Sequence, residues 1–363
     1  MSEAARFLES VWYGERRRRG AEAVLGPFEA AFRLAARARA ALYARGILRR
    51  IALPVPVVVV GNLSVGGTGK TPLLIWLAER LRERGYSPGI VSRGYGGKSA
   101  VWPRLVEAGA DPLEVGDEPV LVAERTGCPV AVGPDRVAAA ELLLPPRNSG
   151  GGAEARAAAS PPQAAIDVLL SDDGLQHYRL DRAVEIAVVD GRRGLGNGRC
   201  LPAGPLREPP ARLDRVDAVV VNGGTWGGPD ALRAEIAPLF VYRLGTEGSD
   251  AERRALADFA GRRVHAVAGI GHPERFFEML ERHGIDVVRH ALPDHAEILP
   301  RDLDHAGGPV LVTEKDAVKC REFAGDDVWC VVVDLRFPPA ASSALLDRVL
   351  ARLPPPSASG ARR

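Results

Sequence analysis

The chain contains few cysteines and no long apolar run. Its four cysteines, Cys128, Cys200, Cys320 and Cys330, are widely spaced and form no CxxC pair. This pattern argues against a zinc ribbon or a disulfide framework and fits a reducing compartment. No run of about 18 apolar residues is present, so no membrane-spanning helix is expected. Before Ile51, Arg and Glu interrupt every apolar stretch, which is not typical of a secretory signal.

Charge is unevenly distributed, although the net charge of the 363 residues is only +2. Residues 1–50 contain eleven Arg and no Lys against five Glu, a local charge of +6, which leaves −4 on the remainder. A basic head on a mildly acidic body predicts that the head meets an anionic surface. We expect no nucleic-acid partner and no obligate protein partner.

The second part of this head, from about Pro27 to Arg50, shows helical spacing of its apolar residues. The apolar positions are Phe28, Phe32, Ala35, Ala36, Leu42, Tyr43 and Ile47, with arginines between them. Such a helix can lie in a membrane interface, with its guanidinium groups on lipid phosphates. An equally good interpretation is a helix that packs on its own domain and exposes a solvated basic face.

The most specific motif is Gly61–Pro72, GNLSVGGTGKTP, which lies between an apolar segment and a predicted helix. A strand, a glycine-rich turn, Gly-Lys-Thr and a helix form the context of a phosphate-binding P-loop. Ser64 stands where the usual pattern has glycine. A glycine-rich turn that binds no nucleotide is the alternative.

The chemistry of this segment follows from its residue types. Backbone amides of the loop can surround a phosphate, and the helix N-terminus adds a favourable dipole. Lys70 can reach the terminal phosphates, and the Thr71 hydroxyl can hold Mg²⁺. The residues expected to bind ATP here are Gly66, Gly67, Thr68, Gly69, Lys70 and Thr71.

Strands alternate with helices after Pro54. Strands are expected at Val55–Val60, Gly89–Ser92, Val130–Val132, Val168–Ser171, Glu185–Val189 and Ala218–Asn222, and helices at Leu73–Arg84, Glu118–Thr126 and Asp135–Leu144. Continuous apolar strands separated by helices favour a mostly parallel sheet with helices on both faces. We therefore predict a P-loop NTPase-like α/β domain over residues 51–238, with a flexible insertion at 145–164.

A second, smaller α/β domain is expected at residues 239–353. Its predicted strands are Val264–Ile270, Asp286–His290, Val310–Thr313 and Val328–Val333, and its predicted helices are Glu274–His283 and Asp316–Phe323. Residues 241–243 and 331–335 are expected to form a short two-stranded linker to the first domain. The tail, 354–363, is rich in Pro, Ser and Gly and is expected to be disordered.

Two acidic residues follow the predicted strand at Val168–Ser171. In P-loop proteins an Asp at a strand end holds Mg²⁺ beside the P-loop Thr, which makes Asp172 and Asp173 candidate metal ligands. Asp-Asp-Gly is also good turn chemistry, so a plain turn is the alternative. Gln176 and His177 follow closely and are candidates for nucleotide binding, with a structural role for His177 left open.

Other candidate residues lie where predicted strands end or helices begin. Asp117 and Glu118 open a helix, where Asp117 is either an N-cap or a general base for phosphoryl transfer to an alcohol. Arg93 and Tyr95 follow the second strand and are expected to face the same crevice as the P-loop, although a plain turn is possible. His295 is structural by default, and it gains catalytic weight only if it faces the catalytic carboxylate.

A long loop without regular periodicity runs from Gly194 to Pro209 and is rich in Gly and Pro. Loops of this length in compact domains are usually functional. Arg207, near its end, is a candidate for a substrate contact.

Together these segments resemble one family, the tetraacyldisaccharide 4′-kinases, which act on lipid A precursors in Gram-negative bacteria. The matching segments are GNLSVGGTGKTP, SRGYGG, VGDEP, DDGLQH, GNG…LPAGPLREP, AGIGHPERFF, PDH and TEKDAVK. They occur in order from Gly61 to Lys319. A lone P-loop is a weak signal, but this ordered set is highly specific.

The resemblance implies ATP-dependent phosphorylation of the 4′-hydroxyl of an acylated glucosamine disaccharide 1-phosphate, with Mg²⁺ as cofactor. It also implies a peripheral location on the cytoplasmic face of the inner membrane, which favours the membrane-binding interpretation of residues 1–50. It further implies that Asp117 is the base, assisted by His295, and that Asp172 and Asp173 serve Mg²⁺ and the phosphates.

The expected mechanism is direct in-line transfer, with Lys70 and the loop amides on the β- and γ-phosphates. Arg93, Tyr95, Glu118 and Arg207 are the candidates for substrate contacts. The rival class is a nucleotide-hydrolysing switch or metallochaperone-type NTPase that acts on a protein partner.

Three features depart from the family's pattern. Ala296 stands where a second histidine often follows His295, and Leu175 replaces an aromatic residue in DDGLQH. The insertion at 145–164 is long for the family. None of these departures removes a proposed catalytic group.

Overall fold

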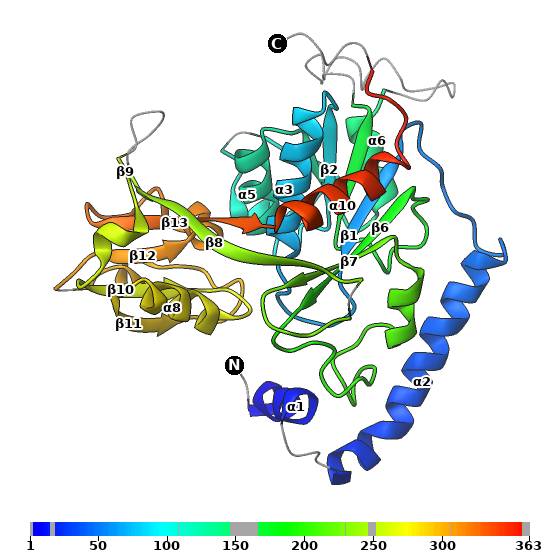
Figure 1. Ribbon diagram of the computed structural model, residues 1–363, viewed down its shortest axis with the longest axis horizontal. Helices are drawn as coiled ribbons and strands as arrows, with labels where there is room; N and C mark the ends of the chain where they lie inside the picture. Colours follow the sequence, from blue (N-terminus) through cyan, green and yellow to red (C-terminus); the bar gives the residue numbers. More distant parts are fainter. Residues whose placement is uncertain are drawn as a thin grey trace.

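The computed structural model describes residues 3–14, 19–107, 109–145, 166–228, 230–245, 252–305 and 307–357. Residues 146–164 of the expected insertion and residues 358–363 of the expected tail lie outside these ranges. The described part of the chain contains one twisted sheet with helices on both faces, and two long strands connect its larger and smaller parts (Figure 1).

The larger part, here called the first unit, is built around parallel strands in the order β7-β6-β1-β5-β2-β4. They are β1 (Val57–Gly61), β2 (Pro88–Ser92), β4 (Val130–Val132), β5 (Val168–Asp172), β6 (Val184–Asp190) and β7 (Ala218–Asn222). Each expected strand of this unit is present within one or two residues of its predicted bounds. A short strand that was not predicted, β3 (Arg104–Val106), pairs antiparallel with β4 at the edge.

Helices cover both faces of this sheet, as the apolar strands predicted. Leucines of α3 (Lys70–Glu83) and α10 (Pro339–Leu350) share one core with β1, β5 and β6, while α6 (Arg136–Leu143) packs on the opposite face. The short α4 (Pro112–Val115), α5 (Asp117–Thr126) and the 3₁₀ turn η1 (Pro210–Arg215) lie in the connections. This layering places the ends of β1, β2 and β5 on one side of the first unit.

The second unit repeats the arrangement on a smaller scale. Its parallel strands are β10 (Arg263–Ala268), β11 (Asp286–Ala291) and β12 (Val310–Thr313), with β11 at the edge. Residues of α8 (Pro273–Arg282) pack on one face, and residues of α9 (Glu314–Cys320) pack on the other. The remaining short elements are β9 (Arg253–Arg254), η3 (Leu256–Phe259) and η4 (Pro300–Asp302).

The two units share a continuous sheet. Strands β8 (Leu232–Arg243) and β13 (Val328–Arg336) pair antiparallel from Trp329 opposite Arg243 to Arg336 opposite Glu235, and β8 also pairs with β7. Both strands are longer than the two-stranded linker expected from the sequence, and the expected boundary at residue 238 falls inside β8. The following helix, α10, was not predicted and returns to the core of the first unit (Figure 1).

The N-terminal head forms α1 (Glu3–Tyr13) and the long helix α2 (Arg19–Ala44). The predicted start at Pro27 is wrong by two turns, because the helix continues through this proline at the loss of one backbone hydrogen bond. Glu29 anchors the inner face of α2, since its buried carboxylate accepts hydrogen bonds from Arg199 at 3.2 and 2.9 Å. Among the described helices, none combines the length and the apolar composition needed to cross a bilayer.

Candidate active site

The P-loop lies between β1 and α3 and is held in shape by two asparagines. The Asn62 side-chain amide donates to the carbonyls of Ser64 and Gly66 at 2.7 and 3.2 Å. The Asn222 amide, at the end of β7, donates to the Thr68 carbonyl at 3.1 Å. Gly69 has a φ of 95°, and a Cβ there would lie 2.4 Å from Nδ2 of Asn222, so both backbone and space require glycine. The loop is therefore preorganised to present its amides.

The Ser64 position, which departs from the usual P-loop pattern, is part of a contact with the long loop at 194–209. Ser64 is buried and forms an isolated antiparallel bridge with Leu206. The next amide, that of Val65, donates to the Pro205 carbonyl at 2.9 Å, and the Arg207 amide donates to the Leu63 carbonyl at 2.7 Å. Ser64, in place of glycine, suits this pairing because the pairing needs an extended backbone. The pairing also brings Arg207 to the phosphate-binding region.

Asp172 and Asp173 follow one another but differ in environment. Asp172, paired with Val60 across β1 and β5, is buried, and its Oδ2 accepts a hydrogen bond from Ser92 at 3.1 Å. Within the described residues its Oδ1 has no hydrogen-bond partner. Burial, followed by the negative charge of Glu118, raises the pKa of Asp172 to about 6.

Asp173, in contrast, is neutralised by cations. Arg207 donates to its two carboxylate oxygens at 3.0 and 2.9 Å, and Lys70 lies 3.6 Å away. Burial alone would raise the pKa of Asp173, but Lys70 and Arg207 outweigh it and hold this pKa below its usual value. Asp173 also has a left-handed φ of 46°. Its carboxylate therefore already has two cationic partners at the mouth of the P-loop.

A carboxylate–histidine pair connects the two units. Nδ1 of His295 lies 3.0 and 3.2 Å from the two carboxylate oxygens of Asp117. Burial would raise the pKa of Asp117, but the hydrogen bond from His295 and the charge of Lys315 outweigh it and lower this pKa. Asp117 is therefore an ionised acceptor at neutral pH. The N-cap of α5 is Gly116, so the alternative role of Asp117 as the N-cap is wrong.

Lys315, the second residue of α9, lies on the other side of the His295 ring. Its Nζ is 3.1 Å from Glu118 Oε1, 3.2 Å from Asp294 Oδ1 and 3.2 Å from Nε2 of His295. The carboxylates of Glu118, Asp117 and Asp294 outweigh burial and raise the pKa of Lys315 above its usual range. Because an ammonium group only donates, Nε2 accepts in the neutral form of the His295 ring, and the single ring proton of that form lies on Nδ1, facing Asp117.

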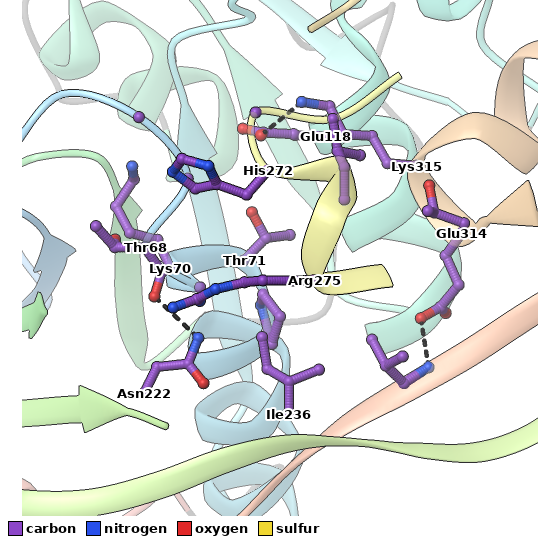
Figure 2. A pocket seen from close by; sticks show the side chains of 18 of the residues that line it. Thr68, Lys70, Thr71, Glu118, Asn222, Ile236, His272, Arg275, Glu314 and Lys315 are labelled. Atoms are coloured by element: carbon purple, nitrogen blue, oxygen red, sulfur yellow. Dashed lines mark hydrogen bonds and ion pairs between the residues drawn. The ribbon is translucent and has the colours of Figure 1, made fainter. Parts of the chain in front are cut away.

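The second unit also covers the P-loop directly. A Cβ at Gly66 would lie 3.6 Å from Nε2 of His272, which precedes α8. Arg275, in the first turn of α8, forms an ion pair with the buried Asp190 at the end of β6. Figure 2 shows both side chains beside Thr68 and Lys70. Burial, followed by the charge of Arg193, lowers the pKa of His272 to about 4, so its ring is neutral at neutral pH.

These groups surround one cleft of about 540 Å³ between the units. The first unit contributes the P-loop and the ends of β2 and β5, while the second contributes the segments after β10, β11 and β12. The predicted residues that line the cleft are Gly66, Gly67, Thr68, Gly69, Lys70, Thr71, Arg93, Tyr95, Glu118, Asp172, Asp173, Arg207 and His295. The structure thus brings together residues spread over more than 200 positions of the chain.

Gln176 and His177 are predicted from the sequence to bind nucleotide. Neither is among the described residues that line the cleft. Gln176 Nε2 donates to the Asn62 carbonyl at 3.2 Å and to Glu208 at 2.9 Å, so Gln176 supports the P-loop from behind. Burial, followed by the charge of Arg136, lowers the pKa of His177 to about 4. These hydrogen bonds assign Gln176 a supporting role in the loop, while direct nucleotide contact by Gln176 and His177 stays a prediction.

Several residues of the site were not predicted: Asn222, His272, Arg275 and Lys315. A usable signal existed for His272 and Lys315, because each closely follows a parallel strand of the second unit, where ligands usually bind. The indication that the second unit faces the P-loop came from the family resemblance, which pairs His295 with Asp117.

Comparisons with known proteins show one family and a similar overall structure. The sequence pattern of the family described as Tetraacyldisaccharide-1-P 4′-kinase matches residues 21–351. The Tetraacyldisaccharide 4′-kinase of Nitrosococcus oceani is 45% identical over 347 residues, which is 95% of each chain. That of Alkalilimnicola ehrlichii is 52% identical over 312 residues, 86% of this chain and 87% of the relative. The crystal structure of LpxK from Aquifex aeolicus in complex with ATP is similar, with a TM-score of 0.72 and 28% identity over 92% of this chain and 99% of that chain.

Proposed function

The chain belongs to the tetraacyldisaccharide 4′-kinase family, the ATP-dependent kinases of lipid A precursors, and on that premise we propose how its residues perform the reaction. The γ-phosphate of ATP is transferred in line to the 4′-hydroxyl of an acylated glucosamine disaccharide 1-phosphate. Family membership favours this kinase activity over the rival of a nucleotide-hydrolysing switch.

The observation that carries the proposal is the Asp117–His295 pair, in which His295 lines the P-loop cleft and Asp117, its hydrogen-bond partner, is buried. Phosphoryl transfer to an alcohol needs a carboxylate that accepts the hydroxyl proton near the γ-phosphate. Asp117 is an ionised carboxylate, and its neighbours Glu118 and His295 line the cleft. A nucleotide-hydrolysing switch would need only a positioned water molecule. A carboxylate base held in place by a histidine from the second unit suits a kinase whose acceptor is an alcohol.

Lys70 and the P-loop amides bind the β- and γ-phosphates, and Arg207 reaches the same region through Asp173. In-line transfer needs little covalent chemistry from the protein, so positioning and charge neutralisation supply most of the acceleration. Arg93, Tyr95 and Glu118 are proposed to contact the lipid headgroup, because they line the cleft on the side of His295.

The residues present fit a magnesium ion. Thr71 lies in the first turn of α3, and Asp172 offers a buried carboxylate oxygen without a partner among the described residues. When bound, Mg²⁺ neutralises charge that develops on the phosphate oxygens. We assign Asp172 as the ligand and Asp173 as the partner of Lys70 and Arg207, because among the described residues Asp172 keeps one carboxylate oxygen without a hydrogen-bond partner and Asp173 does not.

His295 is proposed to position and tune Asp117. With the neutral tautomer that Lys315 imposes, Nδ1–H donates to Asp117 and leaves it basic enough to accept the sugar hydroxyl proton. An imidazolium would stabilise the Asp117 carboxylate further and make it a weaker base. Lys315 is thus a positioning residue that acts through His295.

We further propose that residues 1–50 bind an anionic membrane surface, which would place the enzyme on the cytoplasmic face of the inner membrane. Three apolar side chains of α2 are exposed, with exposed fractions of 69% for Val24, 65% for Phe28 and 70% for Leu34. Arg33 lies between them, and Arg37 and Arg39 follow along the helix. This arrangement suits an interfacial helix, whereas Glu29 and Phe32 on the inner face attach α2 to the first unit.

The direct test is a transfer assay with [γ-³²P]ATP, Mg²⁺ and the acylated disaccharide 1-phosphate in detergent micelles. We expect label on the lipid at the 4′ position. Release of inorganic phosphate without labelled lipid would contradict the proposal and favour the switch.

A further inference from the structure

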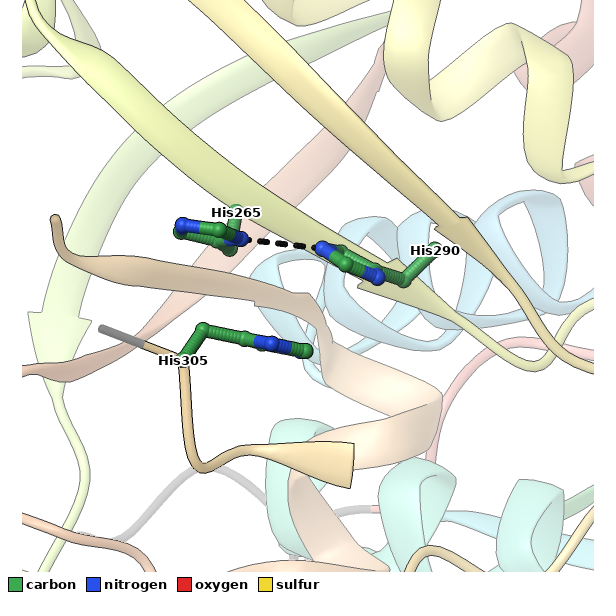
Figure 3. A group of neighbouring side chains, drawn as sticks. All are labelled: His265, His290 and His305. Carbon is green, nitrogen blue, oxygen red and sulfur yellow. Dashed lines mark hydrogen bonds between the residues drawn. The ribbon is translucent and has the colours of Figure 1, made fainter. Parts of the chain in front are cut away.

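Three histidines gather at the open edge of the second unit. His265 lies on β10, His290 on the edge strand β11, and His305 on the connection between η4 and β12 (Figure 3). The register pairs Val267 with His290, so His265 and His290 project from the same face of the sheet. None of the three is among the described residues that line the phosphate cleft.

The rings are close enough to share a ligand. One ring nitrogen of each histidine lies within 4.8 Å of one from each of the others. Nδ1 of His265 is 3.0 Å from Nε2 of His290, and the ring of His305 stacks on both at centroid distances of 4.6 and 4.0 Å. All three side chains are partly exposed, so an ion from solvent can reach them.

The hydrogen bonds leave lone pairs within this cluster. His305 Nε2 is 3.0 Å from the Asp302 carbonyl, which only accepts, so Nε2 carries the proton and Nδ1 keeps its lone pair. A metal-binding histidine typically donates its other ring N–H to a carbonyl in this way, which fixes its tautomer. His265 and His290 share one proton between their facing nitrogens, so metal binding by both rings must release this proton and weakens at low pH.

We propose that His265, His290 and His305 together bind one divalent transition-metal ion of the zinc class. Imidazole nitrogen suits Zn²⁺, Ni²⁺ and Cu²⁺, whereas Mg²⁺ prefers oxygen ligands, so this site is chemically distinct from the carboxylates of the cleft. The bound ion joins the edge strand β11 to β10 and to the segment that precedes β12. It therefore stabilises the second unit and leaves a fourth position for water or another ligand.

Binding requires a small rearrangement. Zn–N bonds of about 2.1 Å separate ligand nitrogens in a tetrahedral site by about 3.4 Å, so the widest pair closes by up to about 1.4 Å and the rings turn out of their stack. His305 lies on a connection outside the sheet ladder, so its ring can move without breaking strand pairing.

The test uses the full chain, stripped with a chelator and exchanged into Mg²⁺-free buffer, and titrated with ZnCl₂ by calorimetry. The variants are His290→Gln and His305→Gln. The controls are His283→Gln, an exposed histidine of the same unit, and His295→Gln in the cleft. We expect the wild type and both controls to bind one more equivalent of Zn²⁺ than the two cluster variants do. If the cluster variants still bind this equivalent, we expect their affinity for it to be at least about tenfold lower. Zn²⁺ should raise the Tm of the wild type and not that of the cluster variants.

Equal stoichiometry and affinity in the wild type and both cluster variants would overturn the proposal. Loss of the equivalent in His295→Gln alone would assign the ion to the Asp117–His295 pair and overturn it as well. A measurement on the wild type keeps the test valid if a variant misfolds. Zn²⁺ should protect the three histidines from diethylpyrocarbonate, mapped by mass spectrometry, and unchanged labelling at all three would refute the site.

Discussion

Nδ1 of His295 lies 3.0 Å from Oδ1 of Asp117, although 178 positions separate them and they belong to different units. His295 holds a left-handed φ of 58°, a conformation that costs a residue with a side chain roughly 1 kcal/mol or more. This strained backbone directs the ring across the cleft towards α5. The geometry of the proposed base therefore depends on how the two units meet.

Replacing the proposed base should abolish transfer without preventing nucleotide binding. For Asp117→Ala or Asp117→Asn we expect kcat for the lipid to fall by about 10²- to 10⁴-fold, because no group remains to accept the hydroxyl proton. ATP affinity, measured by calorimetry, should be unchanged because the P-loop is intact. Asp111→Asn, which alters an exposed N-cap, is the control. Near-normal lipid phosphorylation in Asp117→Ala would remove this residue from its role.

Removing Lys315 should shift the pH profile. Burial and the charge of Lys315 lower the pKa of His295, but the hydrogen bond to Asp117 and its charge outweigh them and hold this pKa above its ordinary value. In Lys315→Met the pKa of His295 rises further, so the neutral ring exists only at higher pH. The acidic limb of kcat/KM should therefore move to higher pH, with a lower kcat at pH 7.

Lys98→Met is the matched control, because it removes one positive charge, as Lys315→Met does, but from an exposed residue. A purely structural role for Lys315 would lower the amount of active enzyme and leave the position of the acidic limb unchanged. Lys315→Arg should restore most of the profile, since it keeps the charge beside His295.

Asp172 and Asp173 should affect stability with opposite sign. The folded-state pKa of Asp172, about 6, lies above its ordinary value of 3.8. Stability therefore falls as pH rises through this window, and the ionised group destabilises the fold at pH 7.5. Asp172→Asn should therefore raise Tm at pH 7.5. The pKa of Asp173 is lowered, so its ionised form stabilises the fold, and Asp173→Asn should lower Tm.

Differential scanning fluorimetry without Mg²⁺ measures both changes in Tm. At pH 4 the increase in Tm caused by Asp172→Asn should disappear. In activity assays Asp172→Asn should raise the half-saturating Mg²⁺ concentration far more than Asp173→Asn does. The reverse order would exchange the two roles.

The outer face of α2 should control membrane binding. Replacing Val24, Phe28 and Leu34 with serine removes three exposed apolar side chains and should weaken sedimentation with anionic phospholipid vesicles at least about tenfold, which corresponds to about 1.4 kcal/mol. The apparent KM for the lipid should rise, while kcat in detergent should be unchanged. Serine at Val101 and Leu239, which are exposed apolar residues elsewhere, is the control. Equal vesicle binding by both variants would refute the interfacial helix.

The strands were predictable because their signal is local. β4 and β7 lie at their predicted bounds, since a short, continuous apolar run between turn residues leaves little choice. The helix α10 was missed because its proline start and its alanine and serine content resemble the tail that follows. Its helical state depends on three leucine and valine side chains that enter the core of the first unit, and no local pattern carries that information.

The sequence by itself determined the P-loop, the parallel strands of the two units, and the family, because each of these depends on residue types within contiguous segments. The tertiary structure alone decided that Lys315 faces His295, that His272 covers the P-loop and that three histidines meet at a sheet edge. It also separated Asp172 from Asp173. Adjacent carboxylates have the same intrinsic chemistry, and only burial and the position of distant cations make one a buried group with a free oxygen and the other a paired anion.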